Sequence, residues 1–148
     1  MKRRHYLSLA MAVATLLPGI LLAQPPGGGR MRIGRTIDDC TARTSEFRVS
    51  LRRALNRSGL DGTAREDELN TQAARLERNM QKVAEDWNGS HDVRRTRVHA
   101  SRAIEAAQDI NRTMLRRRMN ERVQEQWRGV RRELNRLAEA FELPRLQW

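Results

Sequence analysis

Cysteine, proline and aromatic side chains are scarce in this chain of 148 residues. Its single cysteine, Cys40, cannot form an intrachain disulfide, so we expect the thiol to be buried or free, or else bonded to a second molecule. The four prolines leave the stretch from 36 to 142 without one. No segment shows the alternation of apolar and polar residues that is typical of strands. Helices and an apolar core are therefore expected to hold the fold.

Motifs for the common catalytic and cofactor sites are missing as well. Haem attachment through C-x-x-C-H needs two cysteines. A di-iron bundle needs Glu-x-x-His on two helices, whereas Asn88 and Thr96 stand three residues before His91 and His99. These histidines are eight residues apart, which does not match a zinc pair on one helical face. Since no glycine loop for phosphate and no nucleophile on a tight turn is present, we expect no catalytic residue, cofactor, metal or enzymatic activity.

The first 23 residues have the layout of a secretory signal peptide. Basic residues at positions 2–4 precede an uncharged apolar run from Leu7 to Ile20, and cleavage is expected after Ala23. The run is shorter than the about 20 residues that span a bilayer, so cleavage is favoured over an uncleaved anchor. The segment "RRHYL" also resembles a twin-arginine signal, but the general secretory route is favoured because no cofactor motif requires export of a folded chain. We expect a periplasmic or extracellular protein with no membrane anchor after cleavage.

Positive charge dominates the rest of the chain. Without the three basic residues of the signal, 26 basic residues stand against 18 acidic ones, a net charge of +8, and only Lys82 among the 26 is a lysine. Arginine forks match carboxylate and phosphate groups, although a GC-rich genome would also favour arginine codons. The charge favours acidic partners in general. Nucleic acid is not expected as a partner, because the chain has a predicted secretion signal and carries no recognition motif.

Helical spacing of apolar residues dominates after a Pro/Gly-rich linker at 24–36, which is expected to be disordered. The stripes recur every three or four residues, so each helix should turn one face inward. Short connections make neighbouring helices antiparallel, which predicts an all-α fold, an up-down-up-down antiparallel four-helix bundle at 37–148 with coiled-coil-like packing. The four helices are predicted at about 37–57, 64–88, 91–115 and 120–142. The predicted core comprises Phe47, Leu51, Leu55, Leu69, Leu76, Met80, Val83, Trp87, Ile104, Met114, Val123, Trp127, Val130, Leu134, Leu137 and Phe141.

Cap residues mark the ends of the second helix and the start of the third. Thr63 and Glu66 form a capping box, in which the hydroxyl and the carboxylate each accept a free backbone N–H. The pair Asn88-Gly89 should end the second helix, because glycine favours the left-handed position after a helix. Ser90 is then expected to cap the third helix.

No Gly or Pro separates the last two helices, yet their apolar stripes are out of register. Met114 and Val123 are nine residues apart, which on one continuous helix would put the two stripes on opposite sides at 100° per residue. A break near 115–120, with Asn120 as N-cap, brings both stripes into one core. After this last helix, Leu146 and Trp148 are expected to fold back as a hydrophobic clasp.

Two segments of the chain resemble a group of uncharacterised secreted bacterial helical proteins. The group shares an F-x3-L-x2-AL-x-RS-x-LDGT segment and a final W-x2-[LV]-R-x2-LN-x-LA-x2-[FY] helix. The resemblance covers most of 37–148 and implies export and a helical fold, but it implies no activity. The matching residues are Phe47, Leu51, Ala54, Leu55, Ser58, Leu60, Asp61, Gly62, Thr63, Trp127, Arg131, Leu134, Asn135, Leu137, Ala138 and Phe141.

The absence of a catalytic motif and the excess of arginine favour a binding role. The first hypothesis is a non-enzymatic binding module whose cationic surface contacts an anionic envelope component, such as lipopolysaccharide or acidic phospholipid. The alternatives are a periplasmic chaperone-like helper that binds unfolded client proteins as a homodimer, and a structural protein without a ligand. The candidate anion contacts are Arg116, Arg117 and Arg118 at the predicted break, and Arg128, Arg131 and Arg132 on the outer face of the last helix.

Overall fold

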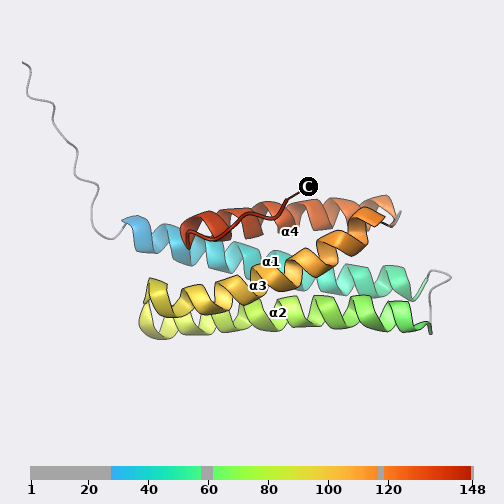
Figure 1. Cartoon of the computed structure of the whole chain (residues 1–148), viewed down its shortest axis with the longest axis horizontal. Coiled ribbons are helices and arrows are strands. Elements are labelled where there is room, and N and C mark those ends of the chain that lie inside the picture. The colour runs from blue at the N-terminus through green and yellow to red at the C-terminus, as the bar shows by residue number, and fades with distance from the viewer. Residues whose placement is uncertain (1–27, 58–61, 117–118, 148) are drawn as a thin grey trace, which may run out of the picture.

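A computed structural model of the chain describes residues 28–57, 62–116 and 119–147. These residues form four helices, with no strand among them, in an up-down-up-down bundle (Figure 1). The predicted signal peptide and residues 24–27 lie outside the described part. The helices are α1 (Gly28–Leu55), α2 (Ala64–Ser90), α3 (Val93–Arg116) and α4 (Glu121–Ala140).

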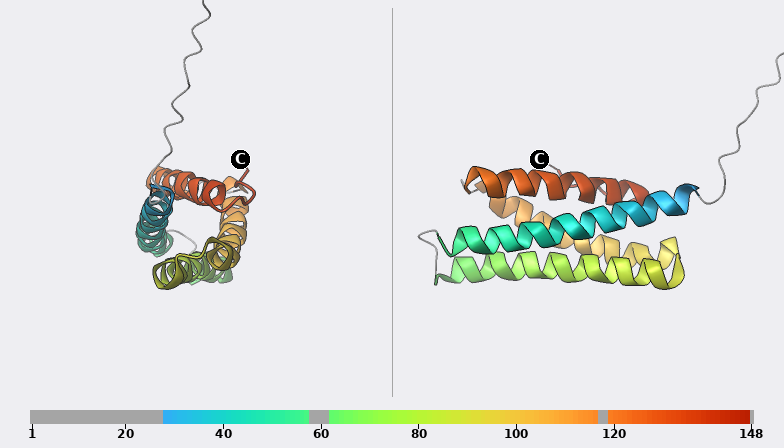
Figure 2. Two further views of the ribbon diagram at one scale, coloured as in Figure 1. Left: turned by 90° about the vertical axis from the view of Figure 1, so that its left-hand side faces the viewer. Right: turned by 180° about the vertical axis from the view of Figure 1, so that it is seen from behind.

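The helices lie along the four sides of a square when the bundle is viewed end-on (Figure 2). Each helix packs against its two neighbours, and the backbones of diagonally opposite helices do not approach closely. The side between α3 and α4 is much less extensively packed than the other three. None of the four helices is both long and apolar enough to cross a bilayer.

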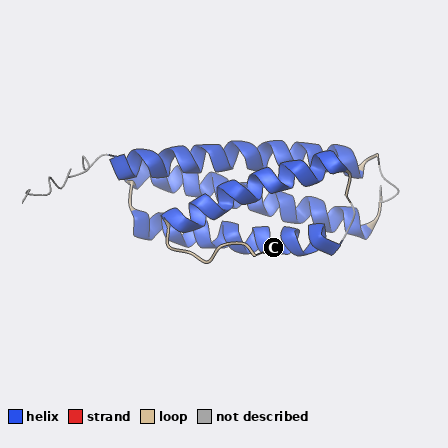
Figure 3. Ribbon diagram, turned by 90° about the horizontal axis from the view of Figure 1, so that it is seen from above, coloured by secondary structure: helices blue, strands red, loops and turns tan. Residues whose placement is uncertain are grey.

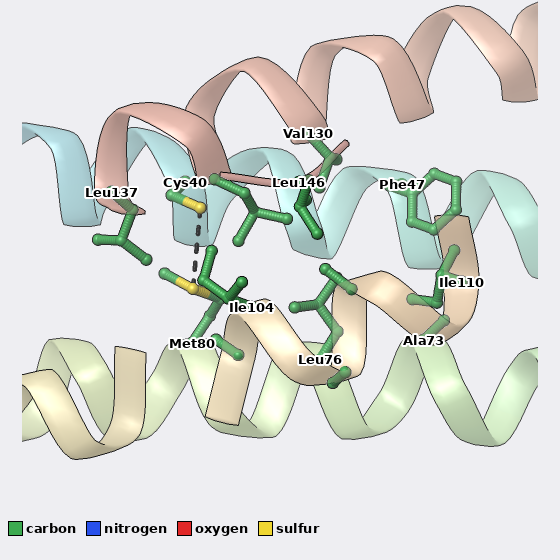
Figure 4. Packing of buried hydrophobic residues seen from close by; sticks show 14 of the residues in the cluster. Cys40, Phe47, Ala73, Leu76, Met80, Ile104, Ile110, Val130, Leu137 and Leu146 are labelled. Carbon is green, nitrogen blue, oxygen red and sulfur yellow. Dashed lines mark hydrogen bonds between the residues drawn. The ribbon is translucent and has the colours of Figure 1, made fainter. Parts of the chain in front are cut away.

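The core lies along the central axis and draws on all four helices (Figure 4). All sixteen residues of the predicted core are buried. Phe47 of α1 and Trp127 of α4 pack against each other in the core, with their rings tilted by 44° and their centroids 5.0 Å apart. Cys40 is a free, fully buried thiol whose Sγ donates to the Met80 sulfur at 3.7 Å. The apolar stripes in the sequence therefore predicted correctly which face of each helix is turned towards the core.

Helix α1 begins at Gly28, so the predicted linker at 24–36 is wrong over 28–36. The apolar stripe reaches further back than expected, because Ile37 is buried and Ile33 is packed against the core. The close approach of Trp87 favours the glycine at position 34, since a Cβ there would lie 3.2 Å from Trp87 Nε1. The apolar contacts of this extra segment outweigh the poor helix propensity of its glycines.

Helix α2 continues through Gly89 and ends after Ser90, so the predicted stop at Asn88-Gly89 is wrong. His91, not a glycine, takes the left-handed position with φ 51°. Its N–H donates to Trp87 O at 2.8 Å, and its ring packs against the Trp87 ring. Asp92, not Ser90, caps α3, because its Oδ1 accepts from the N–H groups of Arg94 and Arg95 at 2.8 and 3.3 Å.

The capping residues Thr63 and Asn120 were predicted correctly. Thr63 Oγ1 accepts from Glu66 N–H at 3.4 Å, and the Glu66 carboxylate accepts from Gly62 N–H at 2.7 Å. Asn120 Oδ1 accepts from Val123 N–H at 3.0 Å. Since α3 ends at Arg116 and α4 begins at Glu121, the predicted break between the last two helices is confirmed.

The segment 142–147 folds back along the bundle after α4, as Figure 3 shows from above. It leaves the helix through Glu142, which has φ 53°, and Leu143 N–H donates to Ala138 O at 2.7 Å. The Leu146 side chain is buried in the core, as predicted. Trp148, the other half of the predicted clasp, lies outside the described residues.

Candidate functional site

The arginines predicted to contact anions do not form one site. Arg116 is exposed at the end of α3, and Arg128 and Arg132 are exposed on α4. Arg117 and Arg118 lie outside the described residues. Arg128 donates to the Glu125 carboxylate at 2.9 Å, and this hydrogen bond and the Arg128 charge lower the pKa of Glu125. Much of the charge of Arg128 is therefore already balanced.

Arg131 is buried, which corrects its placement on the outer face of the last helix. Its Nη1 donates to Asn111 Oδ1 at 3.3 Å, and Trp127 Nε1 donates to the same oxygen at 3.1 Å. Burial of the guanidinium, with a smaller contribution from the charge of Arg128, lowers the pKa of Arg131. The wide spacing of α3 and α4 leaves room for this polar cluster, which the apolar stripe of α4 could not reveal.

Carboxylates on neighbouring helices pair with many of the other arginines. Glu133 is the most enclosed of them, with its side chain 8% exposed between Arg43 at 3.7 Å and Arg136 at 3.1 Å. Such partly exposed pairs contribute little to stability, but they reduce the charge available to a ligand. The pairs that join different helices are Arg43–Glu133, Arg48–Glu77, Arg75–Asp109 and Arg95–Asp86.

Three arginines on α3 are different, because they line a hollow of about 670 Å³ on the outer side of that helix. These arginines are separated by about one turn of the helix. Leu143 of the C-terminal segment also lines the hollow. We call this hollow the arginine groove. Its lining residues are Arg94, Arg97, Val98, Ser101, Arg102, Glu105 and Leu143.

The guanidinium groups of the arginine groove are not neutralised by the carboxylates around them. Among the ion pairs of the described residues, none includes Arg94, Arg97 or Arg102. Arg97 Nη2 donates to a backbone oxygen, Glu142 O, at 3.0 Å. The one acidic lining residue, Glu105, accepts from Ser101 Oγ at 3.3 Å. Planar forks in this setting can bind phosphate or carboxylate oxygens.

An apolar strip accompanies the arginines in this groove. The Val98 side chain is 53% exposed, and Leu143 is half-buried against the core. The position could have been found in the sequence, because residues 94, 97–98, 101–102 and 105 follow helical spacing on the face away from the buried alanines of α3. Sequence reasoning missed it because the runs at 116–118 and 128–132 are denser, and because the position of Leu143 depends on the fold.

The two histidines outside the predicted signal have structural partners. His91 caps α2, and His99 Nε2 lies 3.1 Å from Asp86 Oδ2, with Arg95 Nε 3.6 Å from the other oxygen of that carboxylate. Within the described residues, no three side chains of the metal-binding types come together. The hollow on α3 is a candidate ligand site because its three arginines take part in none of the ion pairs of the described residues.

Comparisons with protein-family models, with curated proteins and with solved structures found no match to this chain. The resemblance to secreted helical proteins stays a prediction.

Proposed function

We propose that the protein is a non-enzymatic binding module, exported to the periplasm or the cell surface, that binds the phosphate-bearing headgroups of an anionic envelope lipid. The arginine groove carries this proposal. Three guanidinium groups line one hollow, and no carboxylate pairs with them in the described residues. The excess positive charge of the groove is complementary to the negative charge of a phosphate group.

A lipid headgroup fits the groove better than a small free anion, because the lining is both cationic and apolar. Arg94, Arg97 and Arg102 can each present a fork to phosphate oxygens. Val98 and Leu143 offer apolar surface to the glycerol and upper acyl carbons next to such a phosphate. The net charge of +8 outside the predicted signal peptide adds long-range attraction to a negative membrane surface.

Binding to lipid vesicles tests this proposal. The full mature chain is sedimented with vesicles of phosphatidylglycerol mixed with phosphatidylcholine, and with vesicles of phosphatidylcholine alone. We expect binding to the anionic vesicles only, weakening as salt rises. Reversal of Arg94, Arg97 and Arg102 to Glu should weaken it by more than a hundredfold, because each basic residue near such a surface contributes about 1 kcal/mol.

A matched control separates the groove from net charge. Arg65, Arg78 and Lys82 are exposed on α2 and form none of the ion pairs of the described residues. Their reversal to Glu changes the net charge by the same amount and should weaken binding far less than the groove variant. Equal weakening by both triple variants would contradict the proposal. Loss of binding only on reversal of Arg116, Arg117 and Arg118 would place the site at the α3–α4 connection.

The chaperone-like alternative has less support. Four of the methionines lie in the described residues, and only Met31 is exposed, at 68%. Met80 and Met114 are buried, and Met119 is packed against the core. These flexible side chains therefore fill the interior instead of forming a surface for clients.

A further inference from the structure

The α3–α4 side of the bundle contains a second built site, which shares Leu143 with the arginine groove but is formed around Leu146. Since α3 and α4 pack against each other least, a gap would remain if nothing lay between them. The extended segment 142–147 lies over this seam, and its Leu146 side chain, 3% exposed, joins the core cluster (Figure 4). The other residues of the segment are exposed or half-buried. Leu146 is therefore the deepest anchor of the segment, and Leu143 packs against the edge of the core.

Two asparagines hold the backbone beside that anchor. On α4, Asn135 Oδ1 accepts from Leu146 N–H at 2.8 Å. On α3, Asn111 Nδ2 donates to Gln147 O at 2.8 Å. The two bonds come from opposite sides of the seam and bind consecutive residues of the peptide. They recognise main-chain groups, so they specify an extended backbone in one register.

The Asn111 amide is oriented by groups of the bundle and not by the peptide alone. Its oxygen accepts from both Trp127 Nε1 and Arg131 Nη1, at 3.1 and 3.3 Å, so its nitrogen must point the other way. Asn111, Trp127 and Arg131 are all buried. A clamp fixed in this way loses little conformational entropy when a peptide enters.

We propose that the α3–α4 seam is a binding site for an extended, leucine-anchored segment, and that a second copy of this chain can supply that segment in trans. The segment occupying the site here is the chain's own, so a second copy carries the same anchor and the same register. It follows the last helix through Glu142 at a positive φ. The side chains of Arg97, Asn111 and Asn135 hold its backbone, so its release breaks no hydrogen bond within a helix. In one chain the effective concentration of the segment is on the order of millimolar, so exchange between copies appears near or above that concentration.

A peptide of residues 142–148, fluorescently labelled, tests the site on a full-length chain with Leu146→Asp. This substitution should expel the chain's own segment and leave the seam open, and circular dichroism should show an unchanged helical content. We expect saturable binding by fluorescence anisotropy. Adding Asn111→Ala or Asn135→Ala to the receptor chain should weaken binding roughly fivefold to tenfold, the effect of one lost hydrogen bond. The same peptide with aspartate in place of its leucine should bind more than tenfold more weakly.

Two controls keep the proposal open to refutation. Arg145 is 63% exposed, and solvent screens its ion pair with Glu139, so a peptide with Arg145→Ala should bind nearly as tightly as the unchanged one. Leu146→Ala replaces Leu146→Asp in the receptor if the charged residue unfolds the bundle. Absence of binding to a folded receptor, or binding that ignores both the leucine and the asparagines, would overturn the site.

Light scattering on the unchanged chain tests whether a second copy of the chain supplies the segment. The mean mass should rise towards that of a dimer as the concentration approaches millimolar, while the Leu146→Asp chain stays monomeric. A wild-type mass that stays constant, or the same rise in both chains, would overturn the assignment of a second copy as the partner.

Discussion

The α1–α2 and α3–α4 sides of the bundle are closed in different ways. On the first side, long apolar side chains such as Leu51, Leu76 and Met80 are fully buried, and the helices pack extensively. On the second, the helices pack little, polar side chains such as Asn111 and Arg131 are buried, and a peptide segment completes the interior. Both the arginine groove and the peptide site lie on or beside this second side. The α1–α2 side thus supplies stability that offsets the cost of burying polar groups on the α3–α4 side.

The largest expected effect comes from the tightly packed side. Leu76→Ala should lower the free energy of unfolding by about 3 kcal/mol, because a fully buried leucine leaves a cavity that its neighbours cannot fill. Leu115→Ala is the control, since Leu115 is 60% exposed and should change stability by less than about 0.5 kcal/mol. Urea denaturation followed by circular dichroism measures both. Similar losses would contradict the burial of Leu76 in the tightly packed side.

The polar cluster on the other side should give the next effect. Asn111→Ala removes the acceptor of Trp127 Nε1 and Arg131 Nη1, and leaving buried donors unsatisfied costs about 2 kcal/mol. Asn79 provides a matched control, because its amide makes one exposed hydrogen bond, to Arg102 O at 3.1 Å. Asn79→Ala should cost about 0.5 kcal/mol in the same denaturation experiment. Equal costs would show that the Asn111 cluster is not buried in solution.

Cys40 makes stability depend on pH. Burial raises the pKa of the Cys40 thiol, so the folded chain keeps it protonated at pH values where the unfolded chain ionises it. Its contribution is complete below about pH 8.5 and falls above it, by about 1.4 kcal/mol per further pH unit. The stability difference between the wild-type chain and Cys40→Ala should therefore shrink between pH 8 and 10. A constant difference would contradict the buried thiol.

The cap of α4 tests the connection between the two helices of the loose side. Asn120→Ala removes the acceptor of Val123 N–H and should cost about 1 kcal/mol. Asn120→Asp is the control, because aspartate caps helices about as well as asparagine. Thermal unfolding of the three chains measures the difference, and an unaffected Ala variant would mean that α3 and α4 do not separate at this cap.

The exposed pair on α4 should give the smallest effect. Arg128→Ala should leave the free energy of unfolding unchanged within error at neutral pH, since solvent screens the pair with Glu125. The pKa of Glu125 should rise towards its ordinary value in this variant, because Arg128 holds it down. Titration by nuclear magnetic resonance measures that change, and no rise would show that the two side chains do not pair in solution.

The apolar stripes predicted the number of helices and every residue of the proposed core, because burial repeats with the helical period. The end of α2 was predicted less well, since His91 takes a position where glycine is expected and its ring gains a contact with Trp87. Arg131 was misplaced because its burial depends on the spacing of two helices. The arginine groove needs α3 and Leu143 together, and no local pattern links residues so far apart in the chain.

The folded-back end of the chain has a mechanical consequence. A force pulling on the C-terminus acts first on Gln147 and then on Leu146, so the bonds to Asn111 and Asn135 break one after the other. A force pulling on Gly28 along the bundle axis must instead slide α1 against α2 and α4 together. The chain should thus peel easily from one end and resist shear at the other. A surface tether at the C-terminus would open the peptide site under load, whereas one at the N-terminus would leave it closed.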